Sequence, residues 1–258
     1  MIEDFYGEYS QYYDVIANDR DFSAQTKLIR SHLDVNDKAH ILELFAGPAY
    51  HGIEFQAKYN DYVAAIENSP HMKDLAEEKG FGSSGEYLIG NIPSDLSHFE
   101  DASFDCILGL RYSIGYLPRE DLFEMLQQSK RMIKAGGKVF LEVHDISAIT
   151  GNLNNDSIRD REKTTAPDKR INCIWPDGTI KWDNFDYKAS MNVSLTIEDQ
   201  HGEVKKCFVS NENIYCAKEV VFLAKLVGFK SKLPQFEGSD KQTWFNEFKS
   251  SIIIELFL

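Results

Sequence analysis

The sequence is poor in basic side chains and in cysteine. It has 28 Lys and Arg against 41 Asp and Glu in 258 residues, which gives a formal net charge of -13. Such an acidic surface repels phosphate backbones, so we expect no nucleic-acid partner. The four cysteines form no C-x-x-C pair and have no histidine at zinc-site spacing. We therefore expect no metal site, and we interpret Cys106, in an apolar run, as a small core residue.

Long hydrophobic runs are also missing. No apolar stretch approaches the roughly 20 residues that span a bilayer. The acidic, aromatic beginning MIEDFYGEYSQYYD lacks the regions of a signal peptide. These absences predict a cytoplasmic protein with no membrane partner. What the chain does have is a hydrophobic fraction of 43%, enough for a packed core, over a length that suits one α/β domain with an insertion.

Strands and helices alternate through residues 39–150, the predicted cofactor-binding core. Apolar runs predict strands at 41–45, 62–66, 87–89, 104–110 and 138–143. Between them, helical patterns occupy 50–58, 69–80 and 120–133, with Ser69 as a candidate N-cap. This alternation predicts βαβ units, and hence an α/β fold with a Rossmann-like, mostly parallel sheet and helices on both faces.

The rest of the single domain 1–258 surrounds this core. Residues 1–38 predict an N-terminal helical cap. In residues 151–212 the alternation stops: 151–170 predicts a loop or lid, and antiparallel strands follow at 173–175, 179–187, 189–198 and 204–210. Turn chemistry lies at 176–178 and 200–202. Residues 213–258 return to the core with a helix at 217–227 and two closing strands.

Polar groups gather at the predicted carboxyl edge of the sheet, where open parallel sheets bind ligands. Glu43 lies inside a strand, and Gly47 lies in a turn that lets backbone approach a ligand. Glu67 ends the next strand, where a carboxylate can accept both hydroxyls of a ribose. Asn91, after the third strand, can bond an adenine amine. Each segment alone also fits an ordinary strand end or turn.

Five segments in order resemble the motifs of class I S-adenosylmethionine-dependent methyltransferases. They are ILELFAGPAYHG, AAIENSPHMKDLA, GNIPSD, FDCILGLRYSIGYL and MIKAGGKVFLEVHD. The resemblance implies S-adenosyl-L-methionine as cofactor and a seven-stranded sheet whose last strand is antiparallel. Together with strand-end position, it suggests these cofactor-binding residues: Glu43, Phe45, Ala46, Gly47, Glu67, Asn68, Met72, Gly90, Asn91, Ile92, Leu110 and Arg20.

The first turn departs from that family's pattern. Where the family has glycines at alternate positions after the strand acid, this sequence has Phe45, Gly47 and Ala49. Pro48 also lacks a backbone N–H. The departure weighs against a dinucleotide, because a pyrophosphate needs the glycines and free N–H groups at the helix start.

Two further segments, Tyr12-Tyr13-Asp14 and Ser113 to Leu117, resemble a subgroup that methylates small molecules, including glycine, sarcosine and sugar N,N-dimethyltransferases. In that subgroup a helix closes over the cofactor and an inserted antiparallel sheet, here 171–210, covers the acceptor pocket. We expect His144 as catalytic base, with Tyr13 beside it. The acceptor-pocket candidates are Tyr112, Tyr116, Glu142, Trp175 and Trp182, whose rings and acid suit a cationic amine.

The sequence therefore predicts an enzyme that methylates an amine of a small molecule, a natural product or a short peptide. Three other interpretations stay open: transfer to oxygen or carbon, a nicotinamide-dependent oxidoreductase, and a non-catalytic cofactor-binding module. A homodimer is an open option for its assembly.

Overall fold

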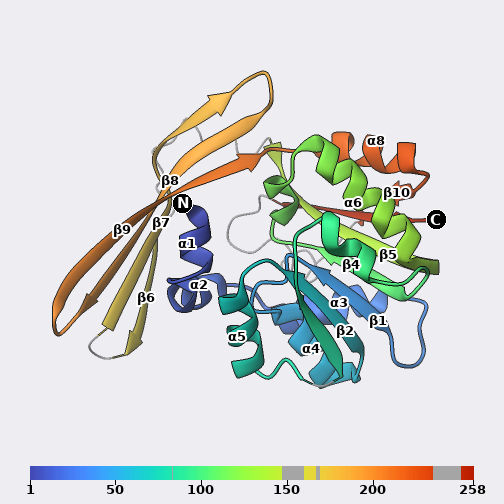
Figure 1. Ribbon diagram of the computed structural model, residues 1–258, viewed down its shortest axis with the longest axis horizontal. Coiled ribbons are helices and arrows are strands. Elements are labelled where there is room, and N and C mark those ends of the chain that lie inside the picture. Colours follow the sequence, from blue (N-terminus) through green and yellow to red (C-terminus); the bar gives the residue numbers. More distant parts are fainter. Residues whose placement is uncertain (83, 147–159, 167–168, 235–250) are drawn as a thin grey trace.

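A computed structural model describes residues 1–82, 84–146, 160–166, 169–234 and 251–258, with the backbone alone in 160–166. Figure 1 shows two β-sheets, an α/β core and a long antiparallel sheet beside it, with two short N-terminal helices between them.

Seven of the described strands form the core sheet, in the order β10-β11-β5-β4-β1-β2-β3. They are β1 (His40–Leu44), β2 (Tyr62–Glu67), β3 (Gly85–Ile89), β4 (Phe104–Gly109), β5 (Ile133–His144), β10 (Lys230–Lys232) and β11 (Ser251–Phe257). β1 to β5 pair in parallel, and β11 pairs antiparallel with both β5 and β10. The predicted seven-stranded sheet with an antiparallel last strand is confirmed.

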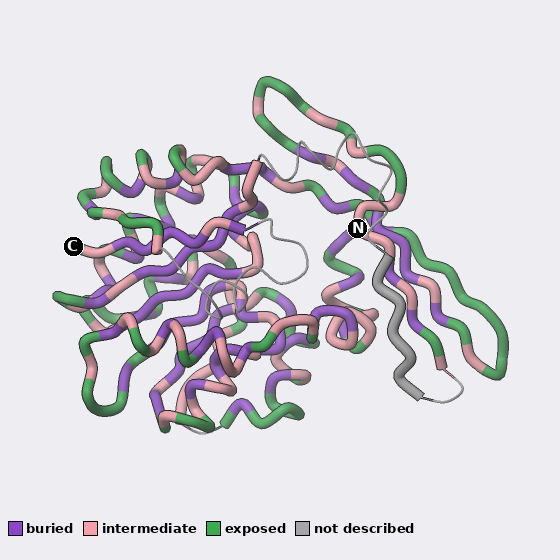
Figure 2. The backbone as a smooth tube through the Cα atoms, turned by 180° about the vertical axis from the view of Figure 1, so that it is seen from behind, coloured by how far each residue is buried: buried purple, intermediate pink, exposed green. Residues whose placement is uncertain are grey.

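Helices cover both faces of this sheet. α3 (Phe22–Ser31), α4 (Tyr50–Tyr59) and α5 (Pro70–Glu78) contribute to one apolar core, and α6 (Arg119–Met132) and α8 (Ala217–Val227) to the other. Two 3-10 helices, η1 (Ser94–His98) and η2 (Ser113–Tyr116), follow β3 and β4. The central strands β1, β2 and β4 are buried along almost their whole length, as Figure 2 shows. Burial on both sides explains why they read as continuous apolar runs.

Ser69 precedes α5 as expected, but its side chain does not cap the helix. The hydroxyl donates instead to the backbone oxygen of Tyr6, at 2.7 Å. The bond fastens α1 (Ile2–Tyr6) to the loop after β2. The N-cap position is thus as predicted, but the side chain accepts no N–H of the first turn and serves as a tertiary donor.

The second sheet, sheet B, contains four described strands: β6 (Asp160–Ala166), β7 (Lys169–Asp183), β8 (Lys188–Asp199) and β9 (Gly202–Asn213). All neighbours are antiparallel, which confirms the inserted sheet. The predicted loop at 151–170 is wrong over 160–166, because that polar segment pairs with β7. Residues 147–159 lie outside the described part of the chain.

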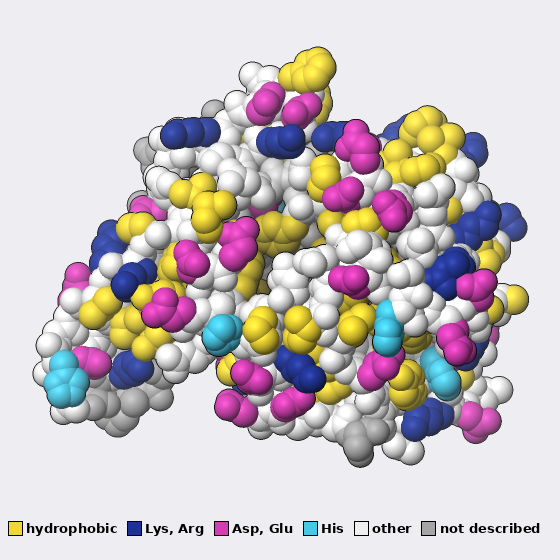
Figure 3. Space-filling view, in the orientation of Figure 1, with side chains coloured by type: hydrophobic (Ala, Val, Ile, Leu, Met, Phe, Trp, Pro, Cys, Tyr) yellow, Lys and Arg dark blue, Asp and Glu magenta, His cyan; other side chains and the backbone are white. Residues whose placement is uncertain are grey.

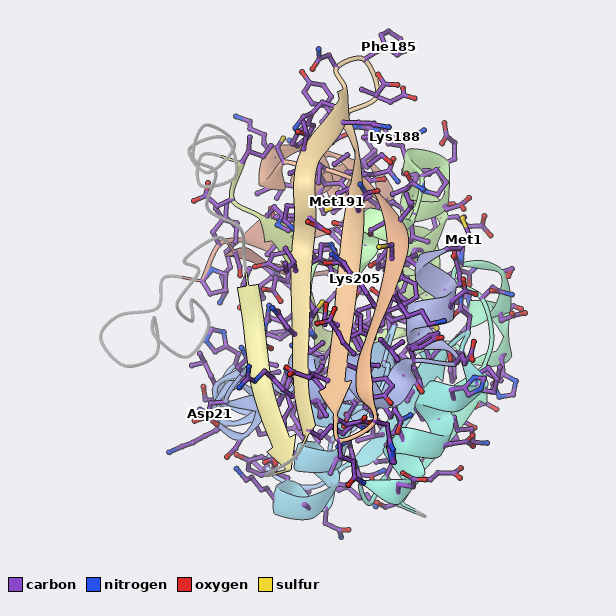
Figure 4. All side chains as sticks on the ribbon, turned by 90° about the vertical axis from the view of Figure 1, so that its left-hand side faces the viewer. Met1, Asp21, Phe185, Lys188, Met191 and Lys205 are labelled. Atoms are coloured by element: carbon purple, nitrogen blue, oxygen red, sulfur yellow. The ribbon has the colours of Figure 1, made fainter. Side chains whose placement is uncertain are left out.

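The predicted turn at 176–178 is also wrong. β7 runs through it, and the pairing with β8 shifts register between Ile174 and Lys181, so Pro and Gly mark a bulge. The chain reverses at 184–187, within the segment expected to be strand. At that tip Phe185 is 92% exposed and points away from the core (Figure 4).

α1 and α2 (Ser10–Ala17) pack between sheet B and the core. Phe5 and Ile16 from these helices share an apolar cluster with Val193 and Phe208 of sheet B. This packing places the N-terminus, the sheet's carboxyl edge and sheet B around one region. No helix in the described residues is long and apolar enough to cross a membrane.

Candidate functional site at the carboxyl edge of the sheet

Two cavities adjoin at the carboxyl edge of the core sheet. One, the β2–β3 cavity, has a volume of about 710 Å³ and is lined by residues that follow those two strands. The other, the β5 cavity, has a volume of about 200 Å³ and reaches from the first turn to the end of β5 and to sheet B. Figure 3 shows hydrophobic side chains in the hollow where sheet B meets the core. Six residues line both cavities: Tyr6, Tyr13, Phe45, Gly47, Ser113 and Tyr116.

The turn after β1 has an unusual backbone. Phe45, Gly47 and Ala49 all have φ of 52°, in the left-handed region that side chains rarely adopt. A Cβ placed on Gly47 would meet no atom within 4 Å, so the turn faces open space. The alternating conformation that glycines favour is therefore kept with Phe and Ala at two of the three positions. Such strain is concentrated at ligand-binding turns.

Glu67 lies at the end of β2 beside this turn. Its carboxylate accepts backbone N–H groups from Asn68 at 3.0 Å, Ser69 at 3.1 Å and Gly47 at 3.3 Å. Burial raises the pKa of Glu67, and these three donors oppose that rise. The β2–β3 cavity is also lined by the other residues expected around the adenosine: Asn68, Met72, Gly90, Asn91 and Ile92.

Glu43 lines the β5 cavity, together with Ala46 and Leu110. Its carboxylate accepts the N–H of Gly52 at 2.8 Å and lies 3.3 Å from Nδ1 of His51. The partner that a buried strand acid needs is thus the first turn of α4.

Arg20 also lines the β5 cavity, but Glu142 engages its guanidinium with two hydrogen bonds, of 2.7 and 3.0 Å. Glu142 also accepts the N–H of Arg111 and the hydroxyl of Ser251, both at 2.7 Å. Burial alone would raise the pKa of Glu142, but Arg20 and these donors lower it to about 2. Glu142 is fully buried and lines neither cavity, so its expected place in the acceptor pocket is corrected.

His144 ends β5 and lines the β5 cavity. Its ring stacks on Tyr112 with centroids 3.9 Å apart and planes within 5°. Nε2 lies 3.9 Å from a carboxylate oxygen of Glu212, on β9. Nδ1 is buried and has no hydrogen-bond partner among the described residues. The expected partner, Glu142, is replaced by Glu212, which the sequence did not single out.

Aromatic rings form much of the remaining wall. The hydroxyls of Tyr6 and Tyr116 are 2.6 Å apart, and the Tyr6 ring meets Tyr13 edge-on at 4.9 Å. Burial, followed by nearby charges, raises the pKa of both Tyr6 and Tyr116, so their rings are neutral. Trp175 lines the β5 cavity as expected. Trp182 does not: it packs on a separate cluster of sheet B, so that prediction is corrected.

The described residues contain no group of three or more His, Cys, Asp or Glu side chains that could hold a metal ion. The two cavities are lined instead by the strand-end acid Glu67, the open turn at Gly47, His144 and several aromatic rings. This set suits binding and aligning two small molecules.

Comparisons with known proteins agree with this geometry. Residues 41–137 match a family model described as a methyltransferase domain. That stretch runs from β1 into β5, and so covers the first turn, Glu67 and Asn91. A search of curated protein sequences finds no match.

Solved structures share the fold over nearly the whole chain. DesVI from Streptomyces venezuelae has a TM-score of 0.72 at 14% identity, covering 95% of this chain and 97% of its own. An S-adenosylmethionine-dependent methyltransferase from Clostridium acetobutylicum has a TM-score of 0.70 at 17% identity, covering 97% and 98%. A sugar N-methyltransferase from Streptoalloteichus has a TM-score of 0.69 at 14% identity, covering 95% and 91%. Sheet B is therefore part of a shared architecture.

Proposed function

We propose that this chain, with its methyltransferase domain at residues 41–137, is an S-adenosylmethionine-dependent methyltransferase acting on an amine of a small molecule or natural product. One observation carries the cofactor assignment: Glu67 ends β2 inside a cavity beside a turn with three left-handed residues. A carboxylate in that position suits a ribose diol. The class I fold shared with the solved methyltransferases supports the same assignment.

The residues present fit this cofactor. Glu67 has about four acceptor positions and gives three to backbone donors, the weakest of them at 3.3 Å. Met72 and Ile92 offer apolar surface for a purine, and Asn91 a polar edge. The open side of Gly47 leaves room for the methionine part. No cluster of phosphate-binding N–H groups is needed, since this part carries no phosphate.

When bound, S-adenosylmethionine supplies an activated methyl group, which leaves sulfur as the acceptor atom binds it. The protein then has to align the acceptor and exclude water. α1 and sheet B cover the carboxyl edge and do both. His144 lines the β5 cavity and can take a proton from the acceptor.

The aromatic rings and the acidic side chains that line the β5 cavity support an amine acceptor. The ring faces of Tyr6, Tyr13 and Tyr116, which line this cavity, attract cations. Two of the similar structures are described as a sugar N-methyltransferase and an amino pentose methyltransferase. Both descriptions concern amine-bearing acceptors and agree with an amine here.

The cofactor assignment predicts that Glu67→Ala weakens S-adenosylhomocysteine binding by about 1–3 kcal/mol, the range for unpaired polar partners. Isothermal calorimetry measures this. Glu78→Ala, an exposed acid on α5, is the matched control and should bind like the wild type. Equal affinity in Glu67→Ala would remove Glu67 from the site. Binding of NAD without S-adenosylhomocysteine would overturn the function.

The acceptor assignment needs a separate experiment. Transfer of labelled methyl should be measured against amino sugars, short peptides with free N-termini, and their hydroxyl counterparts. Transfer to the amines at a rate well above the matched alcohols is the expected result. Transfer to the alcohols alone would show that the acceptor atom is oxygen and not an amine nitrogen.

A further inference from the structure

Most charged side chains of the β5 cavity already have close partners. Asp19 binds Arg111 at 3.1 Å, Arg20 binds Glu142, and Glu43 accepts the N–H of Gly52 at 2.8 Å and lies beside His51. Glu212 is different. No described Lys or Arg lies within ion-pair distance of its carboxylate, and its hydrogen bond comes from the neutral hydroxyl of Ser210, at 2.8 Å. The Glu212 carboxylate in the cavity wall is therefore able to bind a cationic ligand.

The fold holds Glu212 in place. It is the penultimate residue of β9, and the next residue, Asn213, donates from Nδ2 to the carbonyls of Gly115 at 3.1 Å and Leu117 at 2.9 Å. Because side chains alternate along a strand, Glu212 lies on the opposite face from Asn213. The clamp on η2 therefore fixes the acid at the cavity wall.

His144 faces this acid from the core side. Tyr112 stacks on its ring, and Ser251 bonds the Tyr112 hydroxyl at 2.9 Å, so the imidazole is held in one plane. Glu212 lies across the cavity from the ring, and the Arg20 guanidinium, which is paired with Glu142, lies 5.7 Å from the centroid of the stacked Tyr112 ring. At 3.9 Å the Nε2–Glu212 distance is too long for a hydrogen bond, so both groups are available to a third partner.

We propose that Glu212 binds the ammonium group of the acceptor and holds it against His144, which takes its proton. This inference rests on the proposed function and deepens it: the acceptor is a primary or secondary amine that enters protonated. The aromatic walls formed by Tyr6, Tyr13, Tyr116 and Trp175 complete a cation-binding site around the acid.

The proton balance is simple. The ammonium nitrogen gives one proton to Nε2 of His144, which becomes an imidazolium next to the Glu212 carboxylate. The nitrogen regains its lone pair and becomes the nucleophile. After methylation it is again a cation, so Glu212 faces a positive charge before and after transfer. Once the His144 imidazolium has released its proton to solvent, the same site can accept the methylated amine for a second round.

The test uses a probe that needs no knowledge of the natural acceptor. Methylammonium is titrated into the full-length protein saturated with S-adenosylhomocysteine, at constant ionic strength. The imidazole signals of His144, assigned by their loss in His144→Asn, are followed by NMR. We expect a saturable shift in the wild type, and a dissociation constant raised at least about tenfold in Glu212→Gln.

Four controls make the result specific. Glu203→Gln, an exposed acid on the same strand, should behave as the wild type. Methanol, which is neutral, should give no saturable shift. Unchanged S-adenosylhomocysteine affinity shows that Glu212→Gln is folded, and Glu212→Asp should keep partial methylammonium binding.

Equal methylammonium affinity in Glu212→Gln, an equal response to methanol, or no saturable shift in the wild type would each overturn the assignment. If S-adenosylhomocysteine binds normally while this happens, the methyltransferase proposal survives. Failure of S-adenosylhomocysteine to bind would instead remove the proposed function itself.

Discussion

Glu142 is a buried acid whose ionised form holds several groups of the site together. It is fully buried, and its partners are Arg20, Ser251 and the N–H of Arg111. Its pKa in the folded protein is about 2, below the ordinary value of 4.5. A depressed pKa gives stability that is present above pH 4.5 and is lost as the pH falls towards 2. The ionised form is therefore part of the fold at neutral pH.

Glu142→Gln should lower the free energy of unfolding by about 3–5 kcal/mol at pH 7, because it leaves a buried guanidinium without its counter-ion. Urea unfolding at a series of pH values measures this. The difference in the free energy of unfolding between Glu142→Gln and the wild type should shrink as the pH falls from 4.5 to 2. Glu198→Gln, which removes an exposed ion pair with Arg170, should change little. A difference that stays constant with pH would contradict the assigned pKa.

Some residues of the site could be predicted from the sequence and others could not. Glu67, Asn91 and the first turn could be placed because each directly follows a strand. The left-handed backbone at Phe45 and Ala49 could not, because their residue types disfavour it and only tertiary packing imposes it. Arg20 was expected to bind the cofactor, and Glu142 occupies its guanidinium instead.

Among the elements, the end of β9 attaches sheet B to η2 of the core. Asn213 joins it to η2 through two carbonyls, and Tyr215 adds a hydrogen bond of 2.7 Å from its hydroxyl to Leu117. Gly115 lies so close that a Cβ on it would be 3.0 Å from the backbone oxygen of Asn213. This junction fixes sheet B on the core at the point where Glu212 meets His144.

Asn213→Ala should destabilise the protein by about 1–3 kcal/mol, since it leaves a buried carbonyl without its donor. Hydrogen exchange should also become faster in β9 and η2, but not in β1 or β2. Denaturant unfolding and amide exchange measure the two effects. Asn192→Ala, at an exposed position of β8, is the control. Unchanged exchange at both β9 and η2 would show that the clamp does not hold the junction.

The elements were predicted unequally, for a physical reason. Strands of the core sheet are apolar runs because both faces are buried, so β1, β2 and β4 were visible in the sequence. Sheet B has one face towards α1 and α2 and the other more exposed, which gives a weaker signal. The polar strand β6 was therefore predicted as loop, and the Pro-Asp-Gly bulge in β7 as a turn, since both use the same residue types.

At the scale of the molecule, the site is a junction of three parts. The core supplies Glu67, Gly47 and His144, the N-terminal helices supply Tyr6 and Tyr13, and sheet B supplies Trp175 and Glu212. The Glu212–His144 contact joins residues on different sheets. No periodicity or spacing in the sequence encodes how sheet B packs on the core, so the partner of His144 could not be predicted.

Because the site draws on all three parts, its ligand should stabilise the whole fold. A ligand at 100 times its dissociation constant adds about 2.7 kcal/mol to the free energy of unfolding. For a chain of this length that corresponds to a rise in Tm of about 5–10 °C. S-adenosylhomocysteine should produce this rise in calorimetric melting, and NAD at the same concentration should not. The rise should be smaller in Glu67→Ala and unchanged in Glu78→Ala. A rise with NAD alone would point to a dinucleotide site, and no rise with either would mean that the two cavities do not hold the proposed cofactor.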